Sequence, residues 1–229
     1  MDIITKIRNL IFENKDLEYR DFSYKLNPGI DNDSYIGVRI PILRSISKIV
    51  EKESDIDIFL NNLPHKYFEE YLVHRFILEN MKDYDKALIL LNKLLPYFNS
   101  WSLTDGFKNK AFLKRKNDYI FEIYKWIDSD NTFISRFGIG QLMNYLKDDF
   151  KIEYLEKVIS KSANDDYYLE MMISWFLQVS FTYHFNETYL IFKNAKLNKF
   201  IINKTISKCN DSYRISEHEK EILKDLRRK

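Results

Sequence analysis

The sequence is built around one short stretch, Asn99-Ser100-Trp101-Ser102-Leu103-Thr104-Asp105-Gly106-Phe107. It leads into a predicted helix over residues 101–113, in which Trp101 and Asp105 lie four positions apart on one side. An aromatic face, a carboxylate and a basic surface in one segment suit a cationic ligand held beside an anionic polymer. The basic surface comes from the cations that follow, which are Lys108, Lys110, Lys114, Arg115 and Lys116.

The same stretch also has a purely structural interpretation. Ser102-Leu103-Thr104-Asp105 matches the [ST]-x-x-[DE] capping box found at helix starts. A run of basic residues is commonly a solvated helix face. The segment alone therefore leaves both ligand binding and helix capping open.

The composition favours an all-α fold. The chain has 229 residues with only 5 glycines and 4 prolines, whereas β-sandwiches and barrels use both residues freely in tight turns. Lys and Arg (36) nearly balance Asp and Glu (34), so any nucleic-acid surface must come from local clustering of cations. We predict an all-α protein with a single domain over residues 1–229.

Several classes of chemistry find no support in the sequence. The single cysteine, Cys209, excludes an intrachain disulfide and a CxxC site. The sequence contains no Gly-rich phosphate loop, HExxH, GxSxG or EF-hand pattern. We therefore expect no metal and no cofactor. The histidines lie far apart in the sequence and are not expected to be ligands: His65, His74, His184 and His218.

The sequence favours a soluble cytoplasmic protein with no membrane contact. No apolar run approaches the ~18 residues of a membrane span. The N-terminus lacks the charged start and continuous apolar core of a signal peptide. The lone cysteine fits a reducing compartment.

Apolar residues at helical spacing predict helices along nearly the whole chain. Pro41 is suited to begin one helix and Asn27-Pro28-Gly29 to end another. Polar links such as Asp128-Ser129-Asp130-Asn131 and Ala163-Asn164-Asp165-Asp166 carry N-cap and turn residues. Helix pairs recur about every 35 residues, which predicts a curved helical-repeat solenoid with a concave face. The expected helices cover residues 2–14, 16–26, 41–50, 55–62, 64–80, 84–96, 101–113, 116–128, 130–146, 151–161, 165–184, 187–194, 198–209 and 216–228.

Four segments carry the motifs of a known family. Tyr35–Arg44 looks like an aromatic-x-G-V/I-x-x-P-x-x-R segment, and Asn99–Asp105 like a central Trp and Asp motif. Asp130–Arg136 is similar to a D-N-x-x-x-x-R helix, and Tyr167–Trp175 to an F-F-x-x-K-A-I-G-W helix. In this order the segments resemble the DNA alkylation repair proteins built from HEAT-like repeats, one branch of which removes alkylated purines. The likeness runs from about residue 35 to the end.

The resemblance implies roles for four residues: Asp105 as the catalytic carboxylate, Trp101 and Trp175 as aromatic contacts, and Arg136 as a cation contacting the DNA backbone. An N3- or N7-alkylated purine is cationic and leaves easily, so a carboxylate that stabilises the oxocarbenium-like sugar fits the chemistry. Tryptophan faces attract cations. Trp175 fits a core position equally well, and Arg136 fits a helix surface. The partner would be double-stranded DNA bound by a monomer, through Lys108, Lys110, Lys114, Arg115, Arg39, Lys204 and Lys208.

The chain departs from the active branch at particular positions. Ser102 follows Trp101 where that branch has Asp, and Met171 and Gln178 replace a Lys and an Arg. The expected second helix, residues 16–26, is also shorter than the corresponding helix of the active branch. A sister branch that resembles the chain in these features is associated with DNA without glycosylase activity.

Three hypotheses remain open at this point: an alkylpurine DNA glycosylase, a non-catalytic DNA-binding scaffold, and a protein-binding solenoid. A continuous basic stripe along a concave face favours DNA, and an apolar groove favours protein.

Overall fold

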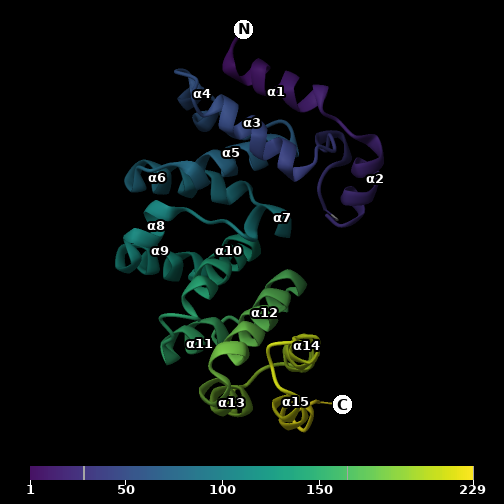
Figure 1. Ribbon diagram of the computed structural model, residues 1–229, viewed down its shortest axis with the longest axis vertical. Helices are drawn as coiled ribbons and strands as arrows, with labels where there is room; N and C mark the ends of the chain where they lie inside the picture. Colours follow the sequence, from purple (N-terminus) through teal and green to yellow (C-terminus); the bar gives the residue numbers. More distant parts are fainter. Residues whose placement is uncertain (28, 164, 229) are drawn as a thin grey trace. The chain divides into compact units, whose positions relative to one another are not determined.

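The computed structural model describes residues 1–27, 29–163 and 165–228, and every regular element in these ranges is a helix (Figure 1). The all-α prediction is therefore confirmed for the described residues. The α-helices are α1 (Ile3–Glu13), α2 (Leu17–Lys25), α3 (Ile40–Val50), α4 (Ile56–Asn61), α5 (Phe68–Asn80), α6 (Tyr84–Leu94), α7 (Trp101–Thr104), α8 (Lys110–Lys114), α9 (Lys116–Asp128), α10 (Thr132–Leu142), α11 (Ile152–Ile159), α12 (Tyr167–Tyr183), α13 (Phe185–Asn194), α14 (Lys199–Asn210) and α15 (Glu217–Lys224).

The chain forms two compact units, residues 1–116 and residues 117–229. Each unit has its own apolar core, and each is described separately below. The single domain expected over the whole chain stays a prediction. None of the helices in the described part of the chain is both long and apolar enough to cross a membrane.

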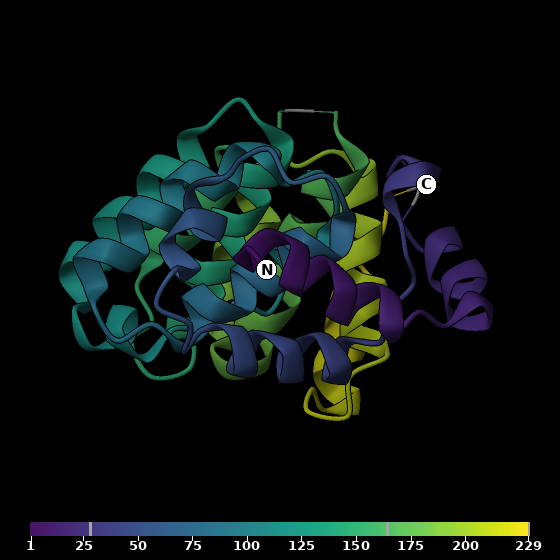
Figure 2. The same ribbon diagram turned by 90° about the horizontal axis from the view of Figure 1, so that it is seen from above.

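In the first unit, α3 packs between α1 and α5. The buried faces follow the helical period, with Ile3, Ile7 and Ile11 on α1 and Leu43 and Ile46 on α3. α2 lies beyond the C-terminal end of α1, away from this stack (Figure 2). Its position must therefore be fixed by something other than the main core.

The extended segment before α3 attaches α2 to the first unit. The backbone N–H of Asp16 donates to the carbonyl of Gly37 at 2.9 Å. The Arg20 guanidinium on α2 donates to the carbonyl of Tyr35 at 2.9 Å. On the other side, the Glu69 carboxylate on α5 accepts hydrogen bonds from the backbone N–H groups of Ile36 at 3.1 Å and Gly37 at 2.7 Å. The segment is thus held between α2 and α5.

Gly37 is required by this packing. Its φ of +88° lies in the left-handed region, and a Cβ at this position would lie 2.3 Å from the Cβ and 2.8 Å from the Cα of Arg20. Only glycine avoids both problems. The glycine of the Tyr35–Arg44 motif therefore has a packing role.

Comparison of two glycines tests this role. Gly29 has a φ of +97° with no atom within 4 Å of a built Cβ, so Gly29→Ala should cost about 1–2 kcal/mol from the backbone alone. Gly37→Ala should cost a further ~1–3 kcal/mol from overpacking against Arg20. Urea unfolding of both variants measures the difference. Equal losses of unfolding free energy would contradict the packing role.

In the second unit, α12 packs between α10 and α14, and α13 packs on α11 and α12 (Figure 1). Side chains cap the N-termini of these helices, with Asn131 before α10, Asp166 before α12 and Asn198 before α14. The polar links of the sequence thus supply helix caps as expected. Alternate helices pack on one another as a helical-repeat array requires, and the HEAT-like identity of the repeats stays a prediction.

The helix predicted over residues 101–113 is wrong. α7 ends at Thr104, Asp105 is extended (φ −85°, ψ 142°), and Gly106 has a φ of +74°. A new helix, α8, begins only after Asn109, whose side chain caps it. Trp101 and Asp105 therefore do not lie on one side of a helix.

The remaining predicted helices agree with the structure to within about one helical turn. Pro41 is the second residue of α3, and α2 ends at Lys25. Pro28 of the expected helix stop and Asn164 of the expected link lie outside the described residues.

Two of the histidines, His65 and His74, are separated by nine positions in the sequence and are adjacent in space. His65 Nε2 and His74 Nδ1 lie 2.9 Å apart in a hydrogen bond, and both rings are buried. Burial lowers the pKa of His65 to about 3 and that of His74 well below its usual value. The pair is therefore neutral near pH 7 and serves packing in the core beside Phe59.

Candidate functional site

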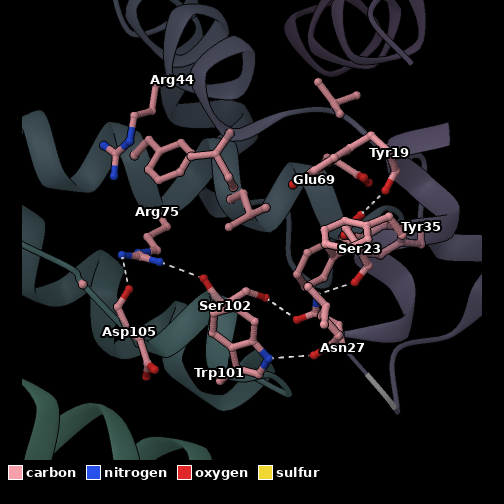
Figure 3. A pocket seen from close by; sticks show the side chains of 18 residues that line it. Tyr19, Ser23, Asn27, Tyr35, Arg44, Glu69, Arg75, Trp101, Ser102 and Asp105 are labelled. Carbon is pink, nitrogen blue, oxygen red and sulfur yellow. Dashed lines mark hydrogen bonds between the residues drawn. The ribbon is translucent and has the colours of Figure 1, made fainter. Parts of the chain in front are cut away.

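The first unit contains a pocket of about 300 Å³ that reaches from α2 to the α7 turn (Figure 3). Asp105 and Gly106 lie at the α7 side of the pocket, and Ser23 and Asn27 lie at the α2 side. Much of its wall is aromatic, from Tyr19, Phe22, Tyr35, Phe68, Phe76 and Trp101.

Arg75 fixes the turn that carries Trp101 and Asp105. This residue of α5 is 3% exposed, and its guanidinium donates to the carbonyls of Ser102 at 2.9 Å and Asp105 at 2.7 Å (Figure 3). It also forms an ion pair with Glu79 at 3.0 Å. A continuing α-helix would use the Ser102 carbonyl for its own ladder, so Arg75 explains why α7 stops early.

The positive charge of the buried Arg75 is offset by a neighbouring carboxylate. Burial lowers the pKa of the Arg75 guanidinium from its usual value, and the neighbouring Glu79 carboxylate acts in the opposite direction. Glu79 also pairs with Arg44 at 2.8 Å, and the Arg44 guanidinium lies 4.0 Å from the centre of the Phe76 ring. The site thus contains a charged network that the sequence analysis did not identify. The signal was present, because charged and polar residues, including Glu69, Arg75 and Glu79, occur among the buried apolar residues of α5.

Trp101 is held in one orientation. Its indole N–H donates to the carbonyl of Leu26, just after α2, at 2.8 Å (Figure 3). The residue is 38% exposed, so part of its ring faces solvent. A fixed and accessible aromatic face is what binding of a flat or cationic group requires.

Ser102 links the same two elements, and the capping-box interpretation of this residue is wrong. The residue lies inside α7, and its hydroxyl donates to Asn27 Oδ1 at 2.6 Å. The Asn27 amide nitrogen donates in turn to the carbonyl of Ser23 at 3.0 Å. The serine at this position therefore joins α7 to the end of α2.

Ser102→Asp should consequently destabilise the protein. A carboxylate would face the Asn27 carbonyl oxygen, at a cost of about 1–3 kcal/mol in unfolding free energy. Ser102→Ala removes only the hydrogen bond and should cost about 0.5–1.5 kcal/mol. Thermal and urea unfolding of the two variants provide the measurement. A Ser102→Asp variant as stable as the wild type would refute the proposed link.

Asp105 lies at the rim of the pocket beside Trp101. Its carboxylate points away from Arg75, whose guanidinium donates to the backbone carbonyl of Asp105 (Figure 3). The Thr104 hydroxyl donates to Asp105 Oδ1 at 2.8 Å. The structure therefore brings Trp101 and Asp105 to one pocket through a turn, in place of the predicted helix face. Their catalytic roles stay predictions.

The basic residues after Phe107 gather around a second cavity of the first unit, of about 820 Å³. Arg115 pairs with Asp85 at 3.1 Å and lies 4.2 Å from the centre of the Tyr84 ring. Lys82 joins the cluster and was not expected from the sequence. Lys82 lies in the turn before α6, where no sequence pattern indicates that it belongs with these cations. The cations that border the cavity are Lys82, Lys108, Lys110, Lys114 and Arg115.

Arg39 has partners within the first unit. Its guanidinium forms an ion pair with Asp16 at 2.9 Å and lies 4.9 Å from the centre of the Tyr19 ring. The side chain is 55% exposed, so a phosphate could still approach it. Its expected contact with DNA stays a prediction.

In the second unit, Trp175 is not a core residue. It is 38% exposed, whereas Met172, Ile173 and Phe176 on the same helix are buried. Its indole therefore remains available to a ligand. At the positions where the active branch carries cations, Met171 is half-buried and the Gln178 amide donates to Thr182 Oγ1 at 2.9 Å.

Arg136 is not a surface charge. It is 6% exposed, and its guanidinium donates to the carbonyl of Tyr168. Burial, followed by the nearby positive charges of Lys204 and Arg136, lowers the pKa of Lys208. The three cations are thus close together in the second unit, and the nearby Asp211 carboxylate acts on the pKa of Lys208 in the opposite direction.

A family model of the DNA alkylation repair enzymes matches residues 4–198 of the chain. The chain belongs to this family. The protein therefore has a role in DNA repair, and DNA is its partner. No curated protein matches the sequence closely enough to add a more specific activity.

Proposed function

We propose that the protein excises cationic N3- or N7-alkylated purines from double-stranded DNA by hydrolysis of the N-glycosidic bond. The observation that carries this proposal is the position of Asp105 and Trp101 together at one aromatic pocket, in a chain that belongs to the DNA alkylation repair enzymes. Monomeric DNA binding is part of the same proposal.

Asp105 supplies the chemistry in this proposal. The alkylated purine already carries a positive charge, so it leaves readily and needs little acid catalysis. Positive charge develops on the sugar as the N-glycosidic bond breaks, and this makes the step difficult. A nearby carboxylate stabilises that charge and orients the attacking water. The Thr104 hydrogen bond and the Arg75 contacts to the backbone support a fixed position for this carboxylate.

Aromatic and basic side chains supply recognition. The exposed face of Trp101 attracts the cationic base by cation–π interaction, worth about 0.5–2 kcal/mol. Trp175 and Arg136 are proposed to contact the lesion and the DNA backbone. The lysines around the second cavity, together with Arg115, Arg39, Lys204 and Lys208, are proposed to contact phosphates, which makes binding dependent on salt.

Base release from methylated duplex DNA tests the proposal. Wild type should release free 3-methyladenine or 7-methylguanine, and Asp105→Asn should slow single-turnover release by about 10²–10³-fold because the stabilising charge is lost. Asp21→Asn, a matched change of a carboxylate that is 75% exposed on α2, should leave the rate unchanged. DNA affinity of each variant is measured in parallel.

A wild-type protein that releases no base at saturating DNA would overturn the glycosylase proposal. Equal rates for wild type and Asp105→Asn would overturn the role of Asp105.

One observation favours a non-catalytic DNA-binding protein as the second candidate. Ser102, where the active branch has an acid, donates a hydrogen bond to Asn27 at the end of α2. Met171 and Gln178, where that branch has cations, carry no charge. This candidate predicts DNA binding that depends on salt without any base release. The protein-binding solenoid has no comparable support, because the second cavity is bordered by cations.

A further inference from the structure

The second cavity of the first unit has a fixed wall. Asn109, which is 2% exposed, joins the end of α5 to the start of α8. Its amide nitrogen donates to the carbonyls of Leu78 at 2.6 Å and Met81 at 2.9 Å. Its amide oxygen accepts from the backbone N–H groups of Ala111 at 2.7 Å and Phe112 at 3.2 Å. The two segments that border the cavity are therefore held together before any ligand binds, which lowers the cost of binding.

Positive charges without carboxylate partners meet in this cavity. Lys82 follows α5 on one wall, and three further lysines lie before and along α8, which are Lys108, Lys110 and Lys114. Within residues 1–27, 29–163 and 165–228, no carboxylate pairs with any of these lysines, whereas the neighbouring Arg115 pairs with Asp85. Ammonium groups that converge on one concave site attract an anion with several charges.

Glu79 is the one carboxylate among the described residues that line the cavity, and its charge is already offset. Its side chain is 7% exposed and forms ion pairs with Arg75 at 3.0 Å and Arg44 at 2.8 Å. The described lining thus offers no unpaired carboxylate for a magnesium ion. The lysines themselves can neutralise a phosphate chain, so an anion of this kind needs no metal to bind here.

Apolar side chains and a flat guanidinium complete the lining. Met81, Ala111 and Leu113 border the cavity, and Leu113 is 46% exposed. The Arg115 guanidinium lies over the Tyr84 ring, 4.2 Å from its centre, and such planar groups also stack on nucleobases. The volume of about 820 Å³ is within the range of small-molecule sites. The cavity therefore suits a ligand that joins a flat or apolar group to a compact set of negative charges.

We infer that the second cavity binds a free nucleoside polyphosphate, with its phosphate chain among the lysines and its nucleoside against Leu113 and Arg115. This ligand goes beyond the proposed function, in which the same lysines contact phosphates of DNA. A polyphosphate carries its charges close together on one short chain, so it meets the lysines of both walls at once. Duplex DNA is too wide to enter a cavity of this size and reaches the lysines only from outside.

Nucleotide binding to the full-length protein tests the inference. Adenosine triphosphate (ATP), adenosine monophosphate (AMP), adenosine and inorganic triphosphate are titrated by isothermal titration calorimetry at low salt with EDTA present. ATP should bind at least about tenfold more tightly than AMP, because its additional phosphates meet further lysines. Adenosine should not bind measurably. Inorganic triphosphate should bind about threefold or more weakly than ATP, because it makes no contact with the apolar wall.

Two double variants with the same change of net charge locate the site. Lys82→Gln with Lys110→Gln removes one charge from each wall and should weaken ATP binding by about tenfold or more, because charge-assisted contacts are lost. Lys48→Gln with Lys52→Gln changes two exposed lysines of the first unit that do not line the cavity. This control should keep the ATP affinity of the wild type to within about twofold, because only the general field of the protein changes.

The outcomes separate the inference from the proposed function. Base release from methylated DNA with no ATP binding in EDTA overturns the inference and leaves the glycosylase proposal intact. ATP binding that the cavity variant weakens, with no base release, supports the inference and overturns catalysis. ATP binding no tighter than that of AMP or inorganic triphosphate overturns the inference. Equal losses in the two double variants also overturn it, because the net charge of the protein would then explain both.

Discussion

The first unit depends on one buried guanidinium. Arg75 crosses from α5 to the α7 turn and holds the carbonyls of Ser102 and Asp105. A buried arginine is costly unless its charge and its donors find partners. Here Glu79 offsets the charge, and the two carbonyls accept from both terminal nitrogens of the guanidinium. The planar fork of arginine donates to the two carbonyls from two separate nitrogens, a fixed geometry that the single nitrogen of lysine does not provide. The orientation of Trp101, Ser102 and Asp105 follows from this arrangement.

A second set of contacts extends the constraint to α2. Trp101 and Ser102 bind the end of α2 at Leu26 and Asn27. Glu69 and Gly37 secure its start through the extended segment. α2 lies outside the main stack, so these polar contacts keep the pocket wall in place. Ser102 stands where the active branch has an acid, so the negative charge of that acid is absent. Ser102 nevertheless contributes to the shape of the pocket.

The sequence predicted the helices well and the site only in part. Periodicity and capping residues such as Asn131 and Asp166 are local, so they could be identified without a structure. The break after Thr104 could not, because it depends on Arg75, which is distant in the sequence. Gly106 and Asn109 were the only local signs of it. Trp101 and Asp105 were correctly placed together, but for a geometric reason that does not hold. The buried Glu69 stands out among the apolar residues of α5 but belongs to no recognisable motif, so its role becomes evident only from its backbone partners.

Hydrogen–deuterium exchange of an Arg75→Lys variant tests the central claim, that Arg75 holds the α7 turn. Lysine keeps the positive charge beside Glu79 and removes the two-pronged contact with the turn. Peptides covering residues 100–106 should exchange faster by about tenfold or more, because the turn loses the charged hydrogen bonds that stabilise it against local opening. Peptides from α12 in the second unit should keep the exchange rates of the wild type. Unchanged protection of residues 100–106 in a folded Arg75→Lys protein would contradict the account.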